Sequence, residues 1–170
     1  MKRLLGPLAL AVIAALAGHF LVLQQAPSFI MDRALVMLEQ RGIPLHGFQL
    51  AERMTPETQS VVRPSPDLAY SACRFDFDEA PDGIKVRMAA TPDYASLSFF
   101  DANTNNFLTL RGEGETRETI LLPPGSAEPP EGSAVSPTTR GVILIRRLAP
   151  TQEAYDAVAA IAAGDACETI

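Results

Sequence analysis

The feature that most constrains this chain is a largely apolar run from Leu4 to Leu23, preceded by Lys2 and Arg3. A helix of about 20 apolar residues crosses the ~30 Å hydrocarbon core of a bilayer. A cleaved signal peptide also fits, since the small-residue pattern at 15–17 would place cleavage before Gly18. Because the apolar run continues past that site, its length favours an uncleaved signal anchor, a transmembrane helix.

The charges on either side of the run predict its orientation. Lys2 and Arg3 precede it, and the positive-inside rule places such a flank in the cytoplasm. Arg33 and Arg41 follow the run, but acidic residues accompany them. We therefore expect a single-pass protein of the bacterial inner membrane, with a cytoplasmic N-terminus and a periplasmic C-terminal domain.

The remainder of the chain is acidic, which bears on its partners. Without Lys2 and Arg3, the 14 basic residues fall to 12 against 20 acidic residues, a net charge of −8. Nucleic acid carries dense negative charge and is not an expected partner. The membrane, through Leu4 to Leu23, and an envelope protein are the candidate partners, and no cofactor is predicted.

The chain divides into three expected parts. Residues 1–25 form the anchor, residues 26–59 a juxtamembrane helix and an irregular linker, and residues 60–170 a β domain with a C-terminal helix. Ser28 can cap the juxtamembrane helix and Gly42 can end it. Its apolar face fits either the membrane surface or the β domain.

Short strand-like segments separated by turn residues dominate the third part. They cover 70–77, 84–89, 94–101, 107–111, 118–123 and 141–148. Six such segments without intervening helices predict a mainly β fold, either an antiparallel β-sandwich or a partly open barrel. The proline-rich segment 123–137 is expected to be an extended surface loop, and a final helix should begin after Thr151 and end at Gly164.

Cys73 and Cys167 are the two cysteines of the chain, and both fall in the part assigned to the oxidising periplasm. A disulfide between them would close a loop of about 95 residues and stabilise the fold by ~4 kcal/mol in the chain-entropy picture. Two buried free thiols are the alternative. The pair is therefore a disulfide candidate.

The polar segment "DANTNN" carries the strongest suggestion of a metal site. Asp101, Asn103 and Asn105 alternate as oxygen ligands do at the start of a calcium loop. The twelfth position, however, is Gly112 where a bidentate acid is needed, and strands flank the segment. Asp and Asn also form hairpin turns through their own side chains. We therefore expect a turn, and no metal site is predicted.

Catalytic constellations are weakly represented. His46 is the one histidine outside the apolar run, and no G-x-S-x-G motif occurs. A Cys73 and His46 nucleophile pair competes with a core or disulfide role for the cysteine. Arg140, Arg146 and Arg147 could bind an anionic ligand, but we expect these arginines on the outer face of the last strand, paired with neighbouring acids. The catalytic residues are therefore unknown.

Three segments carry a family resemblance. "RPSPDLAYSACRFDF", "YASLSFFDANTNNF" and "SPTTRGVILIRRL" resemble, in order and spacing, the bacterial domain-of-unknown-function family twelve fifty-four over about residues 60–165. The chain is similar to the short, membrane-anchored proteobacterial form, whereas longer members add a second all-β domain. The resemblance implies a largely β domain without an assigned activity. The positions on the shared motifs are Pro66, Asp67, Tyr70, Asp101, Asn103, Asn105, Pro137, Thr138 and Arg140.

Two functions follow as hypotheses. The first is an inner-membrane-anchored periplasmic module that binds or assembles envelope components without catalysis, with a ligand surface drawn from Asp67, Tyr70, Asp101, Asn103, Asn105 and Arg140. The alternative is an envelope enzyme that acts on a small molecule or glycan through Asp67, Asp101 and Arg140. Structural roles for these three are a turn cap, a strand-end cap and an ion pair.

Overall fold

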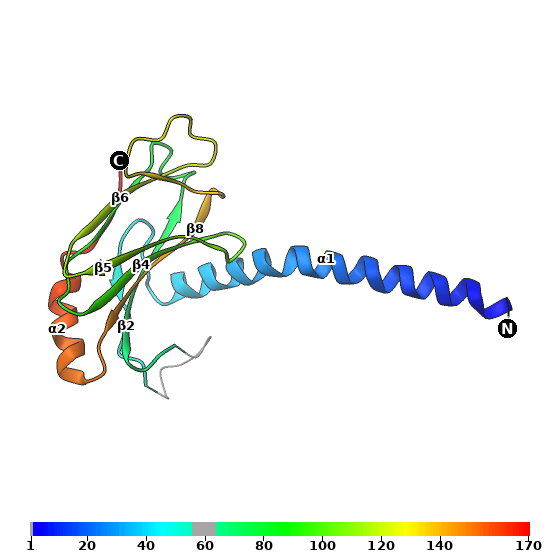
Figure 1. Cartoon of the computed structure of the whole chain (residues 1–170), viewed down its shortest axis with the longest axis horizontal. Helices are drawn as coiled ribbons and strands as arrows, with labels where there is room; N and C mark the ends of the chain where they lie inside the picture. Colours follow the sequence, from blue (N-terminus) through cyan, green and yellow to red (C-terminus); the bar gives the residue numbers. More distant parts are fainter. Residues whose placement is uncertain (1, 56–63) are drawn as a thin grey trace.

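The computed structural model describes residues 2–55 and 64–170 as one long helix followed by two packed β-sheets and a short helix (Figure 1). The sheets face each other as in a sandwich and do not close into a barrel. This architecture confirms the mainly β fold that the strand pattern predicts. The expected linker and the first residues of the expected β domain fall partly in 56–63, outside the described residues.

The first sheet, sheet A, is antiparallel throughout in the order β1-β2-β8-β4-β5. Its strands are β1 (Gln49–Leu50), β2 (Leu68–Asp76), β4 (Tyr94–Asp101), β5 (Asn106–Glu113) and β8 (Arg140–Leu148). The register of β2 and β8 aligns Leu68 with Leu148 at one end and Asp76 with Arg140 at the other. This register decides which motif residues can share a site.

The second sheet, sheet B, has the order β7-β6-β3-β9. Its strands are β3 (Ile84–Met88), β6 (Arg117–Leu122), β7 (Ala134–Val135) and β9 (Ala166–Thr169). The β6 and β7 pair is parallel, and the other pairs are antiparallel. The proline-rich segment is thus a surface loop whose end adds β7 to the sheet.

The core lies between the two sheets, where alternate residues of each strand point inward. Phe75, Phe99 and Ile143 of sheet A and Ile84 and Met88 of sheet B are at most 1% exposed. They belong to one contiguous hydrophobic cluster. Burial of this cluster from water is the main force that holds the two sheets together.

Gly141 shows how tightly β8 is packed between its neighbours. A Cβ atom at this position would collide with the carbonyl oxygen of Phe100 and lie 2.7 Å from the Phe75 ring. No side chain fits there without movement of the β4 backbone. Glycine at this position therefore allows the Phe100 carbonyl and the Phe75 ring to pack closely against this end of β8.

The helix α1 (Lys2–Gln40) runs without interruption through both the expected anchor and the expected juxtamembrane helix. Pro27 lies inside it and lacks the N–H that would bond the carbonyl of Leu23. Ser28 does not begin a new helix but lies inside α1, where its hydroxyl donates to the carbonyl of Gln25 at 3.0 Å. Residues Gly6–Gln40 are long and apolar enough to cross a membrane, a test that a signal sequence also passes.

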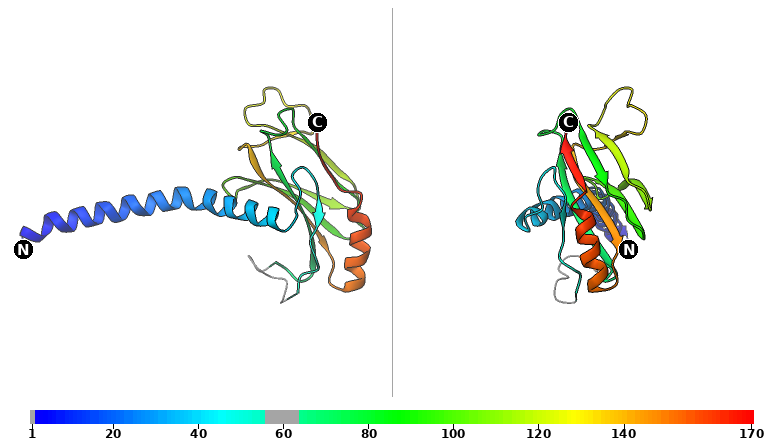
Figure 2. Two further views of the ribbon diagram at one scale, coloured as in Figure 1. Left: turned by 180° about the vertical axis from the view of Figure 1, so that it is seen from behind. Right: turned by 90° about the vertical axis from the view of Figure 1, so that its left-hand side faces the viewer.

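The helix α2 (Gln152–Ala162) lies at the side of the β domain opposite to the N-terminus of α1 (Figures 1 and 2). Thr151 caps it as predicted, since its side chain accepts a hydrogen bond from the Ala154 N–H. Tyr155 and Val158 pack toward the small cluster around Ala69. The helix ends in a turn that leads into β9.

Candidate functional site

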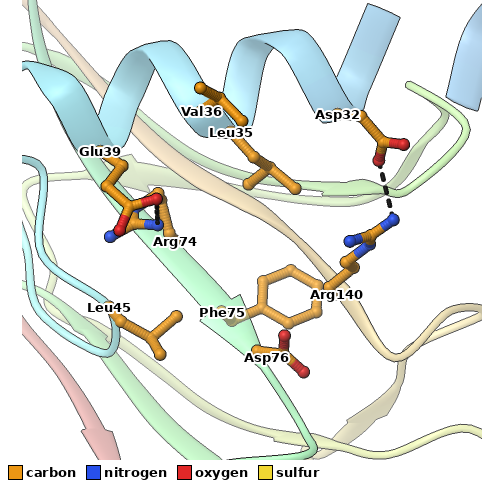
Figure 3. Close-up of a pocket in the computed structure, with 9 residues that line it drawn as sticks. All are labelled: Asp32, Leu35, Val36, Glu39, Leu45, Arg74, Phe75, Asp76 and Arg140. Carbon is orange, nitrogen blue, oxygen red and sulfur yellow. Dashed lines mark hydrogen bonds and ion pairs between the residues drawn. The ribbon is translucent and has the colours of Figure 1, made fainter. Parts of the chain in front are cut away.

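The described residues form a groove where the last turns of α1 lie against the ends of β2 and β8 (Figure 3). Its volume is about 310 Å³. The groove combines apolar and charged side chains from segments far apart in the sequence. It is lined by Asp32, Leu35, Val36, Glu39, Leu45, Arg74, Phe75, Asp76 and Arg140.

Two ion pairs connect α1 to sheet A at the two ends of this groove. Arg140 donates to Asp32 at 2.8 Å, and Arg74 lies 3.4 Å from Glu39. Arg74 also donates through Nε to the carbonyl of Ile43 at 2.9 Å. The Asp32 and Glu39 side chains are 48% and 66% exposed, so the two ion pairs add little to stability.

Apolar contacts accompany these ion pairs. Met31 on α1 and Ile43 after it are each 6% exposed, so both side chains are buried although α1 starts as an isolated helix. Leu35 and Val36 project from α1 toward the groove, opposite Phe75 (Figure 3). The C-terminal turns of α1 are therefore part of the β domain's packing.

The groove places charged and apolar side chains next to one another. Its lining offers carboxylates, guanidinium groups and apolar side chains, and it includes no thiol, hydroxyl or imidazole. A Ser–His or Cys–His nucleophile pair is therefore not among these lining residues. Charged and apolar groups side by side suit a ligand or protein segment of mixed character.

His46 lies next to the groove, and its imidazole is hydrogen-bonded to the backbone of Asp76. Its Nε2 is 3.2 Å from the Asp76 nitrogen, from which it can accept, and 3.0 Å from the Asp76 carbonyl oxygen, to which it can donate. Which bond forms depends on the tautomer. Cys73 is held in a disulfide, so the Cys73 and His46 nucleophile pair does not form.

The Asp101 carboxylate organises the turn between β4 and β5. Its Oδ1 accepts from the N–H groups of Asn103 and Asn105, both at 2.8 Å, and its Oδ2 accepts from the Asn105 side chain at 3.0 Å. Asp101 is 3% exposed, and Thr104 takes a left-handed backbone conformation with φ 65°. The oxygens that a cation would need thus point at the turn's own donors.

This turn is connected to the groove by a short series of hydrogen bonds. The Ala102 N–H donates to the Thr138 hydroxyl, which donates to the carbonyl of Arg140, each at 2.9 Å. Arg140 in turn reaches Asp32. The structure therefore brings Asp101, Asn103, Asn105 and Arg140 to one end of sheet A, beside α1.

Asp67 and Tyr70 lie at the opposite end of the same sheet. The Asp67 carbonyl accepts from Ala149 at 2.7 Å, next to the pair of Leu68 and Leu148. The Tyr70 hydroxyl accepts from the Ser65 N–H at 2.8 Å. Eight residue steps along β2 separate this end from Arg140, roughly 27 Å in an extended strand. Asp67 and Arg140 therefore do not converge on one substrate.

Cys73 of β2 and Cys167 of β9 form a disulfide that joins sheet A to sheet B. The bond connects residues 94 apart in sequence. The two cysteines are 0% and 2% exposed, respectively. A bond buried between the sheets constrains the fold and is inaccessible to a substrate.

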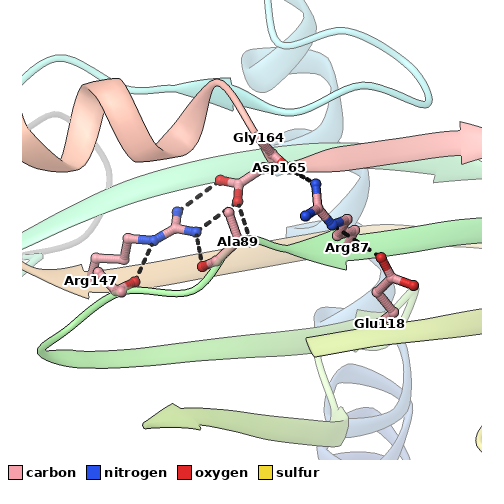
Figure 4. A network of polar contacts seen from close by, with 7 residues as sticks. Arg87, Ala89, Glu118, Arg147, Gly164 and Asp165 are labelled. Atoms are coloured by element: carbon pink, nitrogen blue, oxygen red, sulfur yellow. Dashed lines mark hydrogen bonds and ion pairs between the residues drawn. The ribbon is translucent and has the colours of Figure 1, made fainter. Parts of the chain in front are cut away.

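Arg147 forms a buried network with Asp165, so its expected place on the outer face of the last strand is wrong (Figure 4). Arg147 donates to both Asp165 oxygens, to the Thr91 hydroxyl and to the Ala89 carbonyl. The Ala89 N–H also donates to Asp165 at 2.9 Å. Arg147 points inward because it follows Ile143 and Ile145 at every second position of β8.

Arg146, the neighbour of Arg147, faces the opposite side of sheet A. Its Nη2 donates to the Ser98 hydroxyl at 2.8 Å, and Ser98 contacts Thr109 of β5 at 3.1 Å. The expected acidic partner is replaced by hydroxyl groups. The alternation of β8 was therefore the signal that separates the two arginines.

These features define a class of protein, namely a β-sandwich domain packed on the end of a candidate membrane helix. The sequence matches the family described as "Protein of unknown function (DUF1254)" over residues 47–169. The chain therefore belongs to this family, which confirms the family to which the three segments were assigned. No curated protein matches the sequence.

Two solved structures are similar to the chain. The crystal structure of the VPA0106 protein from Vibrio parahaemolyticus has a TM-score of 0.61 at 12% identity, covering 85% of this chain and 35% of that one. A putative uncharacterized protein from Burkholderia cenocepacia has a TM-score of 0.45 at 17% identity, covering 73% of this chain and 34% of that one. The chain thus spans about a third of each. The first likeness shows a shared fold.

Proposed function

We propose that this protein is a single-pass inner-membrane protein that presents its β-sandwich to the periplasm as a binding or assembly module of the cell envelope. In this proposal residues Leu4 to Leu23 form an uncleaved anchor. The N-terminus is cytoplasmic, in keeping with the cations that precede the apolar run. The groove between α1 and sheet A is the binding surface.

The observation that carries the proposal is the exposure of α1. Its large apolar side chains between Leu8 and Leu23 are 50% to 69% exposed, and none of the apolar window is buried against the β domain. So much contiguous apolar surface is unfavourable in water. A lipid bilayer is the environment in which a helix of this length and composition is stable.

Membrane attachment is tested on the full chain in bacterial cells. We expect it to stay in the membrane fraction through an alkaline carbonate wash and to keep its N-terminal residues in an intact-mass measurement. In the variant Ala160→Cys, on the exposed side of α2, a maleimide that cannot cross the inner membrane should label the periplasmic domain. Release into the wash, or a mass lacking residues 1–17, would refute the anchor.

Binding at the groove is tested by crosslinking in living cells. Val36 and Leu45 line the groove and are 49% and 38% exposed, so a photoreactive residue at either position faces a bound partner. We expect both positions to capture the same envelope protein, whereas a photoreactive residue at Ala160 should not. Identical capture at all three positions, or none at the groove, would count against a binding module.

A further inference from the structure

We propose that the β4–β5 turn (residues 102–106), together with Phe29, Ile30 and Arg33 of α1, forms a surface that rests on the phospholipid headgroups of the membrane. This inference depends on the anchoring proposed above. It adds an interaction surface on the β domain itself. The bilayer is then a partner of the domain as well as of the helix.

The first argument is the position of an exposed apolar pair on α1. Phe29 and Ile30 are 60% and 58% exposed, and the Arg33 guanidinium lies 5.2 Å from the centre of the Phe29 ring. Phe29 lies six residues after Leu23, about 9 Å along the helix. A headgroup layer extends roughly 5–8 Å beyond the hydrocarbon core. The Phe29 ring, with the Arg33 cation over it, and the neighbouring Ile30 side chain are therefore placed near the outer edge of the headgroup layer.

The second argument is the attachment of the turn at nearly the same level. Asp32 lies three residues after Phe29 and forms the 2.8 Å ion pair with Arg140. The carbonyl of Arg140 accepts from the Thr138 hydroxyl, which holds the Ala102 N–H of the turn. The turn thus has a fixed position relative to α1.

The third argument is the direction of the β4–β5 hairpin. Figures 1 and 2 both show it running alongside the C-terminal part of α1, with its turn directed toward the N-terminus of that helix. Asp32 is nine residues past Leu23, about 14 Å along the helix. Asp32 therefore lies ~6 Å beyond the outer edge of the headgroup layer. Two extended residues of the turn are long enough to span this distance.

The composition of the turn suits a phospholipid surface. Asn103, Thr104, Asn105 and Asn106 are exposed and uncharged. The Asn105 and Asn106 side chains bond Asp101 and Thr109 within the hairpin, and the Asn103 and Thr104 side chains add further donors and acceptors. The one acid, Asp101, is buried and saturated by the turn's own N–H groups. The turn therefore offers hydrogen bonds to phosphate and ester groups without repelling their negative charge.

The test uses the full chain in phosphatidylcholine vesicles, labelled with a fluorophore at one introduced cysteine. Asn103→Cys reports the turn, Ala160→Cys on α2 is the matched exposed control, and Leu16→Cys reports the membrane span. Quenching is measured with lipids that carry a nitroxide on the headgroup or on the acyl chain. We expect headgroup nitroxides to quench the Asn103 site several-fold more than the Ala160 site, and acyl-chain nitroxides to quench the Leu16 site.

The outcomes separate this inference from the proposed anchoring. Equal, weak quenching at the Asn103 and Ala160 sites, with strong quenching at the Leu16 site, would overturn the headgroup surface and leave the anchor intact. An unquenched Leu16 site would overturn both. Preferential quenching at the Asn103 site with a quenched Leu16 site would establish the surface.

Discussion

Arg147 and Asp165 form a bidentate ion pair from which water is excluded. Their side chains are 1% and 0% exposed, and the two hydrogen bonds measure 2.6 and 2.7 Å. The pair joins β8 to the turn between α2 and β9, where Arg87 also donates to the Gly164 carbonyl at 2.9 Å. The end of the chain is thereby fixed to both sheets.

Removal of one member of this pair should be strongly destabilising. Asp165→Ala leaves a guanidinium buried without its counter-charge, and we expect a loss of about 3–5 kcal/mol in the free energy of unfolding. Urea titration of the full chain in detergent micelles, followed by circular dichroism of the β signal, measures it. Glu118→Ala removes the partner of Arg87, an exposed pair, and should cost about 0–1 kcal/mol. Equal losses of unfolding free energy in the two variants would show that burial of the ion pair does not determine its contribution to stability.

A double replacement separates the charge from the packing. Arg147→Met with Asp165→Leu leaves no buried charge, so it should lose less stability than Asp165→Ala alone. The same titration compares the two variants. A larger loss in the double variant would mean that the hydrogen bonds to Thr91 and Ala89 dominate the stability of this region.

The disulfide should contribute about 2–5 kcal/mol to the free energy of unfolding, because Cys73 and Cys167 connect the two sheets across most of the β domain. We expect reductant to lower the urea midpoint of the wild-type chain. The variant with alanine at both positions should have the lower urea midpoint both with and without reductant. Two alkylatable thiols in the full chain purified without reductant would contradict the bond.

The Asp101 turn should depend on its carboxylate and be indifferent to calcium. Asp101→Ala removes the acceptor of three hydrogen bonds, for an expected loss of about 1–3 kcal/mol. Asp101→Asn keeps one oxygen acceptor and should lose less. The melting temperature of the wild-type chain should be the same with calcium and with chelator. A calcium-dependent rise that chelator reverses would show a cation site, because a ligand of the folded state raises that temperature.

Tyr155 should make stability fall at alkaline pH. Burial chiefly, with the nearby charges of Glu52 and Asp156, raises the pKa of Tyr155 above 10.0. The folded state then holds the phenolic proton more tightly than the unfolded state does. The resulting stability is complete below pH 10.0 and is lost as the pH rises through the higher folded pKa. Tyr155→Phe should remove this part of the decline in urea titrations across alkaline pH, whereas an unchanged decline would exclude Tyr155 as its source.

Much of the fold could be predicted from local pattern. The main strands and α2 follow from alternation, turn residues and the Thr151 cap, which are properties of neighbouring residues. The strands β1 and β7 have two residues each and exist only because a long strand lies beside them. Such elements have no period of their own in the sequence.

The candidate site was less predictable, because it depends on register and on long-range contacts. The shared motif residues gave no indication that Asp67 and Arg140 occupy opposite ends of one sheet, which the pairing of β2 with β8 decides. Asp32 and Glu39 read as ordinary charges of a helix surface, and their partners follow 108 and 35 residues later. By contrast, the inward position of Arg147 could have been predicted from the alternation of buried and exposed residues along β8.

The continuity of α1 has a consequence for how far the domain can reach. A flexible tether lets an attached domain sample many heights and orientations above a bilayer, whereas a continuous helix acts as a stiff spacer. Because α1 joins the apolar segment to its docking site at Met31 and Asp32 without a break, the β-sandwich turns only together with the helix. In the proposed anchored state, a partner of the groove would meet it at one height and in one orientation.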